Sequence, residues 1–114
     1  MPLLKIQVNI EFPTERQTGL LKTASAAIAE MLGKPERYVM VALETNHEMV
    51  FAGDALPLAY LELKSIDLPD SRTGEFSARL CDFIQEELEI PPERIYIEFT
   101  NVERSMWGWN RQIF

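Results

Sequence analysis

The chain has 114 residues, of which 46% are hydrophobic and 25% are charged. This length fits one domain covering residues 1–114, and the composition excludes disordered and low-complexity proteins. Eighteen acidic and eleven basic residues give a net charge of −7, which argues against a nucleic-acid partner because phosphate contacts need a basic face. One cysteine excludes an internal disulfide, and one cysteine with one histidine excludes a zinc cage, so no metal site is expected.

The sequence gives no sign of membrane attachment. No apolar run approaches the roughly 20 residues that a membrane-spanning helix needs. The N-terminus lacks the basic stretch and the apolar core of a signal peptide. We therefore expect a cytoplasmic protein with no membrane partner, and export without a leader stays open as an alternative.

The first strand and the first helix follow from periodicity. Residues 3–10 alternate apolar and polar side chains, which predicts a strand that starts almost at the terminus. Apolar residues at helical spacing predict a helix over 15–32. Thr14 and Gln17 form a capping-box pattern at the start of this helix, and Gly33 fits its C-terminal end.

The next segment predicts two strands joined by a turn. Residues 38–44 are apolar on both faces, which predicts a central strand covered on both sides. Polar residues 46–48 predict a turn, and a short strand is expected at 49–51.

The second half of the chain predicts the same order of elements. A strand is expected at 58–65, and the loop 67–73 leads into a second helix with apolar residues on one face. Pro91-Pro92 ends that helix. A long strand follows at 94–101, and a short strand is expected near 107–110.

The two halves also share short motifs. These are Pro-Glu-Arg at 35–37 and 92–94, and Pro-Leu at 2–3 and 57–58. Because both matches occur in register with the same element order, we interpret the chain as a duplicated βαβ unit. The predicted repeats cover about 2–52 and 57–101, and a C-terminal tail covers 102–114.

This order predicts an α+β fold of the sandwich type. Right-handed crossovers place both helices on one face of a four-stranded mixed sheet. The second and fourth strands are apolar on both faces, so the uncovered face of the sheet needs a partner surface. Oligomerisation through the sheet is the simplest solution, although the pattern alone does not give the number of copies.

Pro2 is the most informative residue for chemistry. An initiator Met is normally removed when a small residue follows it, and removal leaves a secondary amine at the start of a strand. An α-amino group titrates at about 7.7–8.0, and burial among apolar side chains lowers that pKa, which produces a base that is neutral at physiological pH. Two alternatives stay open: Pro at position two signifies only Met removal, or Met1 stays attached and the Pro2 nitrogen is an amide.

Lys34 is a candidate for anion binding. It follows the helix-ending Gly33 and precedes Pro35, at the mouth of a predicted strand. A lysine there could hold a carboxylate, and an acidic protein needs such a local cation for an anionic substrate. The alternative is that Lys34 only complements the macrodipole at the helix C-terminus.

Aromatic residues crowd the tail. Trp107, Trp109 and Phe114 lie in the last eight residues, where they either line a pocket or anchor the tail to the core. His47 lies in a polar turn and is expected to be solvated, and Cys81 is expected to be a small buried thiol. No phosphate-binding loop, Ser-His-Asp arrangement or metal-ligand spacing is present, so no cofactor is expected.

Motifs spread over nearly the whole chain share their order and spacing with a known family. They are Met1-Pro2-Leu3, Gly33-Lys34-Pro35 with Tyr38, Ser65-Ile66, Cys81, Pro92-Glu93-Arg94-Ile95-Tyr96-Ile97, Gly108-Trp109-Asn110 and Phe114. The chain thereby resembles the macrophage migration inhibitory factor family of the tautomerase superfamily. The resemblance implies a homotrimer in which three sheets enclose a central channel, with sites between subunits. It also implies cofactor-free keto–enol tautomerisation of phenylpyruvate- and hydroxyphenylpyruvate-like 2-oxo acids, and of D-dopachrome.

The same resemblance assigns roles to residues. Pro2 is the general base that moves a proton between the enol oxygen and the adjacent carbon. Lys34 and the backbone amide of Ile66 bind the carboxylate and polarise the 2-oxygen of this small anionic substrate. Tyr96 from the neighbouring subunit lines the pocket. The other implied substrate-binding residues are Tyr38, Trp109 and Phe114 around the aromatic ring, Trp107 at the entrance and Glu98 at the edge.

The chain departs from the animal members of that family at several positions. Glu98 stands in place of an Asn, and Trp107 replaces a smaller aliphatic residue. Leu58 and Leu61 replace a Cys-x-x-Cys pair, so thiol oxidoreductase activity is not expected. Two alternatives stay open: a cytokine-like protein with a receptor partner and a vestigial pocket, or hydration of a halogenated acrylate or decarboxylation of a β-keto acid using Arg72 or Glu98.

Overall fold

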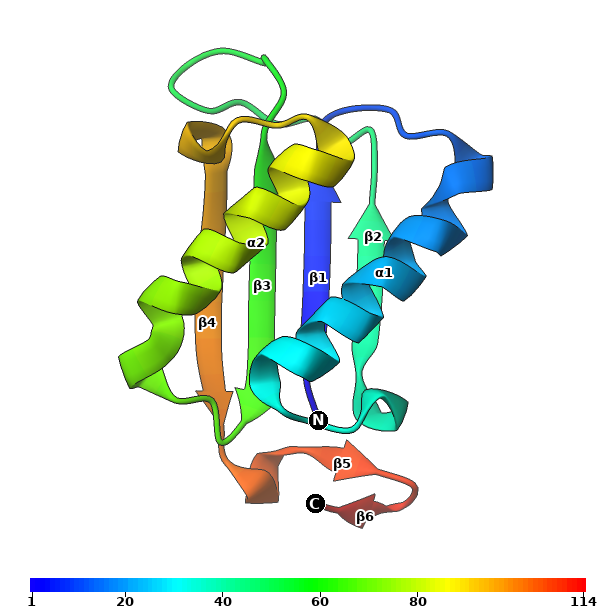
Figure 1. Ribbon diagram of the computed structural model, residues 1–114, viewed down its shortest axis with the longest axis vertical. Helices are drawn as coiled ribbons and strands as arrows, with labels where there is room; N and C mark the ends of the chain where they lie inside the picture. The colour runs from blue at the N-terminus through cyan, green and yellow to red at the C-terminus, as the bar shows by residue number, and fades with distance from the viewer.

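Two helices lie across one face of a four-stranded sheet in the computed structural model, which describes residues 1–114 (Figure 1). The main elements are β1 (Leu3–Val8), α1 (Thr14–Leu32), β2 (Met40–Glu44), β3 (Ala59–Ile66), α2 (Thr73–Leu88) and β4 (Ile95–Val102). Short 3-10 turns lie at Glu36–Tyr38, Asp70–Arg72, Pro92–Arg94 and Arg104–Met106. A separate two-stranded hairpin consists of β5 (Gly108–Trp109) and β6 (Gln112–Ile113).

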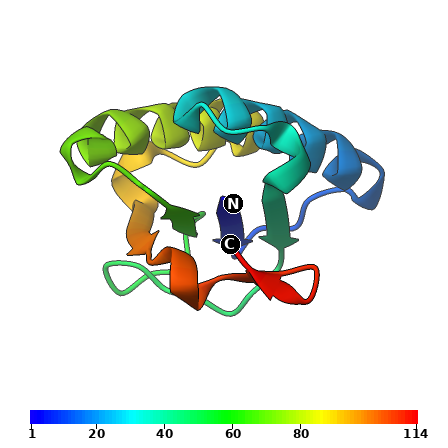
Figure 2. The same ribbon diagram turned by 90° about the horizontal axis from the view of Figure 1, so that it is seen from below.

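The strand order in the sheet is β2-β1-β3-β4. β1 runs parallel to β2 and antiparallel to β3, and β3 runs parallel to β4. Seen from below, the helices form one layer and the strands a second layer (Figure 2). The expected α+β fold, with a mixed sheet and both helices on one face, is confirmed, and the duplication of the two halves stays a prediction.

β1 shows how alternation in the sequence produces the core. Leu4, Ile6 and Val8 face the helices and are completely buried, whereas Lys5 and Gln7 on the other face are half-buried. Full burial of each apolar side chain contributes roughly 1.5–3 kcal/mol. No helix of the chain is long and apolar enough to cross a membrane.

The start of α1 differs from the prediction, and its end does not. Pro13 precedes the helix without a side-chain cap, and Gln17 Nε2 donates to the Phe12 carbonyl oxygen at 3.0 Å. The predicted capping box is wrong because Thr14 already belongs to the helix, so its hydroxyl does not occupy the capping position. Gly33 ends the helix with a φ of 64°, in the left-handed region that glycine adopts without steric cost.

β2 is an edge strand, so the prediction of a central strand is wrong. Val41 and Leu43 pack against the core, but Met40 and Ala42 on the opposite face are exposed. The prediction took apolar residues on both faces as a sign that both faces are covered. In the structure, no segment of this chain covers the apolar side chains of β2 on the open face.

The open face of the sheet is polar along its middle, which corrects the expectation of an apolar face. Lys5 Nζ lies 3.5 Å from the Glu44 carboxylate and 3.7 Å from the Glu62 carboxylate. That expectation considered the second and fourth strands alone, whereas β1 and β3 between them contribute charged side chains. Large apolar side chains of this face lie on the edge strands, where Met40 and Tyr96 are each 66% exposed.

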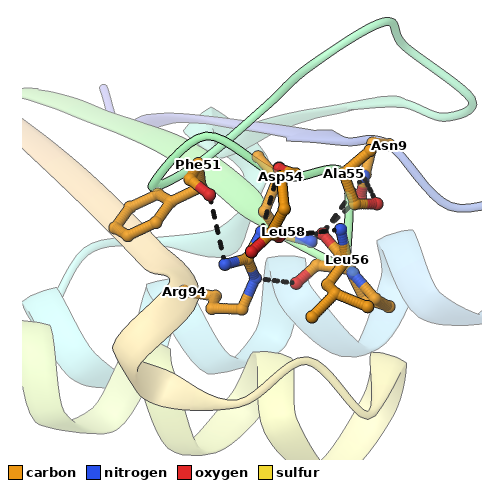
Figure 3. Close-up of polar contacts among 8 residues, drawn as sticks. Asn9, Phe51, Asp54, Ala55, Leu56, Leu58 and Arg94 are labelled. Atoms are coloured by element: carbon orange, nitrogen blue, oxygen red, sulfur yellow. Dashed lines mark hydrogen bonds and ion pairs between the residues drawn. The ribbon is translucent and has the colours of Figure 1, made fainter.

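The segment expected to form a strand at 49–51 is a loop that Arg94 holds in place (Figure 3). The Arg94 guanidinium donates to four carbonyl oxygens, those of Phe51, Asp54, Leu56 and Pro57. It also lies 2.8 Å from the Asp54 carboxylate, and only 12% of the Arg94 side chain is exposed. The strand prediction is wrong because left-handed backbone at Ala52 and Gly53 turns the chain back on itself.

Asn9 holds the other side of the same loop (Figure 3). Its side-chain nitrogen donates to the Ala55 carbonyl oxygen at 2.9 Å, and its side-chain oxygen accepts from the Leu58 amide at 2.9 Å. The loop is therefore fixed from the end of β1 as well as from the start of β4.

Candidate active site

β1 is a central strand, and its first residues lie at the end of the sheet where other segments of the chain converge. Pro2 is fully buried, and its carbonyl oxygen accepts a hydrogen bond from the Met40 amide at 3.0 Å. Leu3 is in register with Met40 at the start of β2 and with Lys64 near the end of β3. The start of β2 and the end of β3 therefore flank Pro2 on its two sides.

A cavity of about 410 Å³, called the N-terminal cavity below, opens beside Pro2. Its lining residues are Met1, Pro2, Leu3, Arg37, Tyr38, Val39, Met40, Trp107, Gly108, Trp109 and Phe114. The volume falls within the range of roughly 300–1,000 Å³ that is typical of small-molecule sites. The structure thus brings five of the predicted site residues together: Pro2, Tyr38, Trp107, Trp109 and Phe114.

Three aromatic rings form one wall of the N-terminal cavity. The Tyr38 ring meets Trp109 and Phe114 edge-on, with ring centres 5.5 and 5.7 Å away. Trp109 and Phe114 stack with their centres 5.3 Å apart. Each such pair contributes roughly 0.5–1.5 kcal/mol beyond area burial. The rings therefore both anchor the tail and line the cavity, which joins the two interpretations that the sequence leaves open.

The C-terminal hairpin brings the end of the chain close to its beginning, as both views show (Figures 1 and 2). The Phe114 amide donates to the Trp107 carbonyl oxygen at 3.1 Å. Arg104 donates to the Phe114 carbonyl oxygen at 3.3 Å, and its other terminal nitrogen lies 3.5 Å from the Asp67 carboxylate. Arg104 thereby fastens the tail to the segment that follows β3.

Lys34 and Ile66 are in direct contact on the β3 side of Pro2. Lys34 Nζ donates to the Ile66 carbonyl oxygen at 3.1 Å. The left-handed turn at Gly33 ends α1 immediately before Lys34, and Ile66 is the last residue of β3. The Lys34 side chain is half-buried beside the N-terminal cavity rather than in its lining.

The amino terminus has a lowered pKa. Met1 precedes Pro2 in this structure, so the amino group belongs to Met1 and the Pro2 nitrogen is an amide. Burial, followed by the positive charges of Lys34 and Arg104, lowers the pKa of the Met1 amino group below its usual value of 8.0. All three causes disfavour the ammonium form, so these cations lie close enough to influence an amine at this position.

Tyr96 and Glu98 lie away from the N-terminal cavity within one chain. Tyr96 pairs with Tyr60, which itself pairs near the opposite end of β1 from Pro2. Glu98 faces the open side of the sheet. There, burial together with the Glu62 and Glu98 carboxylates raises the pKa of Tyr60. A neighbouring chain would have to supply both residues to the cavity.

Two cations near the site, Arg37 and Arg104, are not predicted from the sequence. Arg37 lines the N-terminal cavity, with its guanidinium 4.8 Å from the centre of the Tyr38 ring. Its place beside Tyr38 is the one signal that could have found it. Arg104 gives no signal, because its contact with Phe114 depends on the three-dimensional path of the tail.

The other chemical candidates from the sequence lie outside the N-terminal cavity. His47 is exposed, and Arg72 pairs with Glu75 beside the start of α2. Cys81 is half-buried rather than buried as expected, and this partial burial raises the pKa of its thiol, which makes it a poor nucleophile. No group of three or more His, Cys, Asp or Glu side chains is placed to hold a metal ion.

Comparison with known proteins places this architecture in the tautomerase superfamily. The sequence matches the family described as "Macrophage migration inhibitory factor (MIF)" over residues 1–114. The chain belongs to the macrophage migration inhibitory factor family.

Relatives from distant organisms match over nearly the full length. A macrophage migration inhibitory factor homolog of Trichinella spiralis is 35% identical over 115 residues and covers 100% of both chains. A D-dopachrome decarboxylase of Gallus gallus is 38% identical over 116 residues, covering 99% of this chain and 97% of that protein. The crystal structure of a homologue from Prochlorococcus marinus has a TM-score of 0.91 at 42% identity, over 98% of each chain.

Proposed function

We propose that this protein is a cofactor-independent keto–enol tautomerase acting on phenylpyruvate- and hydroxyphenylpyruvate-like 2-oxo acids. The observation that carries the proposal is the fully buried Pro2 in a cavity with an aromatic wall, beside the cation of Lys34. Family membership supports the class of reaction, and the aromatic wall supports an aromatic substrate.

Removal of Met1 turns Pro2 into the base. A secondary amine then takes the place of the amide at a fully buried position. The causes that lower the pKa of the Met1 amino group, namely burial, Lys34 and Arg104, act on this amine as well. A lowered pKa keeps the amine neutral near physiological pH, which is the state that a general base needs.

The reaction moves one proton between oxygen and carbon without any redox change. The Pro2 nitrogen takes the proton of the enol hydroxyl, the carbonyl forms, and the adjacent carbon receives the proton from the Pro2 ammonium. Lys34 binds the substrate carboxylate, and the Ile66 amide donates to the 2-oxygen, where charge develops. Tyr38 and Trp109 contact the aromatic ring of the substrate.

The active form in this proposal is a homotrimer. Tyr96 and Glu98 reach the N-terminal cavity only if a second chain contributes them. The edge strands β2 and β4 each have one side without a partner strand, and they carry the exposed Met40 and Tyr96. Three sheets joined at these edges would surround a channel lined by the polar middle of the open face.

The first experiment measures the loss of enol absorbance after the protein is mixed with enol phenylpyruvate. Mass measurement of the N-terminus first establishes that Met1 has been removed. Pro2→Gly keeps an amine but changes its basicity and placement, so we expect kcat/KM to fall about 100-fold or more. Pro13→Gly, which changes a proline at the start of α1, is the matched control and should keep full activity.

Two results would contradict the proposal. One is an enol decay no faster with the protein than in buffer, and the other is full activity in a preparation that retains Met1. D-dopachrome is the second substrate to assay, because the relative from Gallus gallus carries that compound in its name.

A further inference from the structure

The N-terminal cavity has a cation on each of two sides. Lys34 contacts Ile66, which ends β3. Arg37 lies in the 3-10 turn shortly before β2 and lines the cavity. Because β2 and β3 flank β1 in the sheet, these cations approach Pro2 from opposite sides. The backbones of β2 and β3 are separated by two strand spacings, roughly 10 Å.

Arg37 has no anionic partner within the chain. None of the six ion pairs includes it, and its guanidinium instead covers the Tyr38 ring at 4.8 Å. A guanidinium stacked on an aromatic face keeps the N–H groups at its edge available, and these groups match the two oxygens of a carboxylate.

Arg94 shows what the corresponding arginine does when the fold itself uses it. The second Pro-Glu-Arg tripeptide forms a 3-10 turn immediately before β4, with Arg94 as its last residue, whereas Arg37 is the middle residue of the turn Glu36–Tyr38. There the guanidinium donates to four carbonyl oxygens and pairs with Asp54 (Figure 3). Arg37 lies in the 3-10 turn that precedes β2, but it lines a cavity and holds no such loop.

We propose that Arg37 forms a second anion-binding subsite and that the preferred substrates are 2-oxo acids with a second carboxylate at the far end of the aromatic ring. This inference rests on the proposed function for the 2-oxo acid end of the ligand. Lys34 binds the carboxylate next to the reacting carbon, and Arg37 binds the distal carboxylate in a bidentate pair. The ring between the two anions lies against Trp109.

Ligand binding tests the subsite independently of catalysis. Both tryptophans of the chain line the N-terminal cavity, so their fluorescence reports its occupancy. The probes are terephthalate, with two carboxylates, and 4-methylbenzoate, which has the same shape and one carboxylate. We expect terephthalate to bind about tenfold more tightly to the wild-type protein, as a charge-assisted bidentate pair predicts.

Variants of Arg37 separate its charge from its shape. Arg37→Gln should abolish the preference for terephthalate and change the affinity for 4-methylbenzoate less than about twofold, while Arg37→Lys should retain part of the preference. Lys22→Gln removes one positive charge from an exposed position on α1 and should leave both affinities unchanged. A wild-type protein that binds both probes equally, or an Arg37→Gln variant that keeps the preference, would overturn the subsite.

Kinetics distinguish failure of the subsite from failure of the proposed reaction. Arg37→Gln should raise the KM for enol 4-carboxyphenylpyruvate about tenfold relative to the KM of the same variant for enol phenylpyruvate. Absence of turnover with both substrates, together with an Arg37-dependent preference for terephthalate, would overturn the tautomerase proposal and support the subsite.

Discussion

Two positive charges act on the amino terminus, and each is held by a different part of the fold. Lys34 is fixed by the Ile66 carbonyl oxygen at the end of β3. Arg104 is fixed by the Phe114 carbonyl oxygen and the Asp67 carboxylate. Neither cation has to touch the amine, because a positive charge in a partly buried site destabilises a nearby ammonium through space. Arg104 is therefore expected to tune the base without contacting the substrate.

Arg104→Gln is expected to move the pH–rate profile to higher pH. The neutral amine is the active form, so the rate rises as pH increases through the pKa of the amine. Removal of a nearby positive charge makes the ammonium less unfavourable and raises that pKa, so the rising limb of the profile shifts to higher pH. Measurement of kcat/KM from about pH 5 to pH 9 reports this pKa for the free enzyme.

The same profile for Lys22→Gln controls for the change in net charge. That variant removes a cation from an exposed position on α1 and should titrate like the wild-type enzyme. Arg104→Lys should restore most of the wild-type profile because it keeps the charge. Coincident profiles for Arg104→Gln and the wild-type enzyme would show that Arg104 only fastens the tail.

Among the connecting segments, the loop between β2 and β3 depends on one side chain at the start of β4. Arg94 donates to four carbonyl oxygens of the loop, including those of Phe51 and Asp54, which also bond to each other's backbone amides, and only 12% of its side chain is exposed. The Phe51 ring lies against the Tyr96 ring at 4.8 Å and under the Arg94 guanidinium at 5.3 Å. The loop is thereby ordered without regular secondary structure.

Arg94→Gln is expected to lower the free energy of unfolding by about 2–3 kcal/mol, because the shorter neutral side chain loses the ion pair with Asp54 and the charge-assisted hydrogen bonds to the loop carbonyl oxygens. Urea denaturation followed by circular dichroism measures the change. Arg16→Gln removes an exposed arginine that covers the Phe12 ring and should change stability by no more than about 0.5 kcal/mol. Equal stabilities for the two variants would mean that water replaces Arg94 without cost.

At the scale of the whole molecule, the two edges of the sheet lack partner strands. β2 and β4 each present one row of backbone groups without a partner strand, and exposed apolar side chains lie beside them. A single exposed edge of this kind favours association with another chain. Association at these edges fits the homotrimer proposed above, so we expect sedimentation equilibrium to give a mass three times the 13.1 kDa of one chain.

Ala42→Glu tests this assembly at the β2 edge. Ala42 is exposed on the open face and in register with Lys5, so an isolated chain tolerates a carboxylate there. In a subunit contact the added carboxylate would lose its water, and Lys5 already pairs with Glu44 and Glu62, so this variant should sediment as single folded chains without tautomerase activity. Ala78→Glu, at an exposed position on α2, is the matched control and should remain trimeric and active. A trimeric, active Ala42→Glu variant would place the subunit contact elsewhere.

The sequence by itself determined the order of the main helices and strands. Side chains that are buried within the chain recur at the period of the strand or helix that carries them, so the pattern is visible in the sequence. Leu4, Ile6 and Val8 alternate since one face of β1 meets the helices, and Gly33 ends α1 since a left-handed residue is needed there. Local chemistry likewise marked Pro2 and Lys34. The rings of the tail were visible as a cluster, but not as a wall facing Tyr38.

Only the tertiary structure decided what depends on contacts between distant segments. β2 became an edge strand although its residues are apolar, because sheet order is set by how the two βαβ units meet and not by local pattern. The loop at 49–51 is held in place by Arg94, which lies more than forty residues further along the chain. The positions of Arg37 and Arg104 near the site also depend on such contacts. The sequence shows that each residue is positively charged, but only the tertiary structure shows which cavity or carbonyl oxygen it faces.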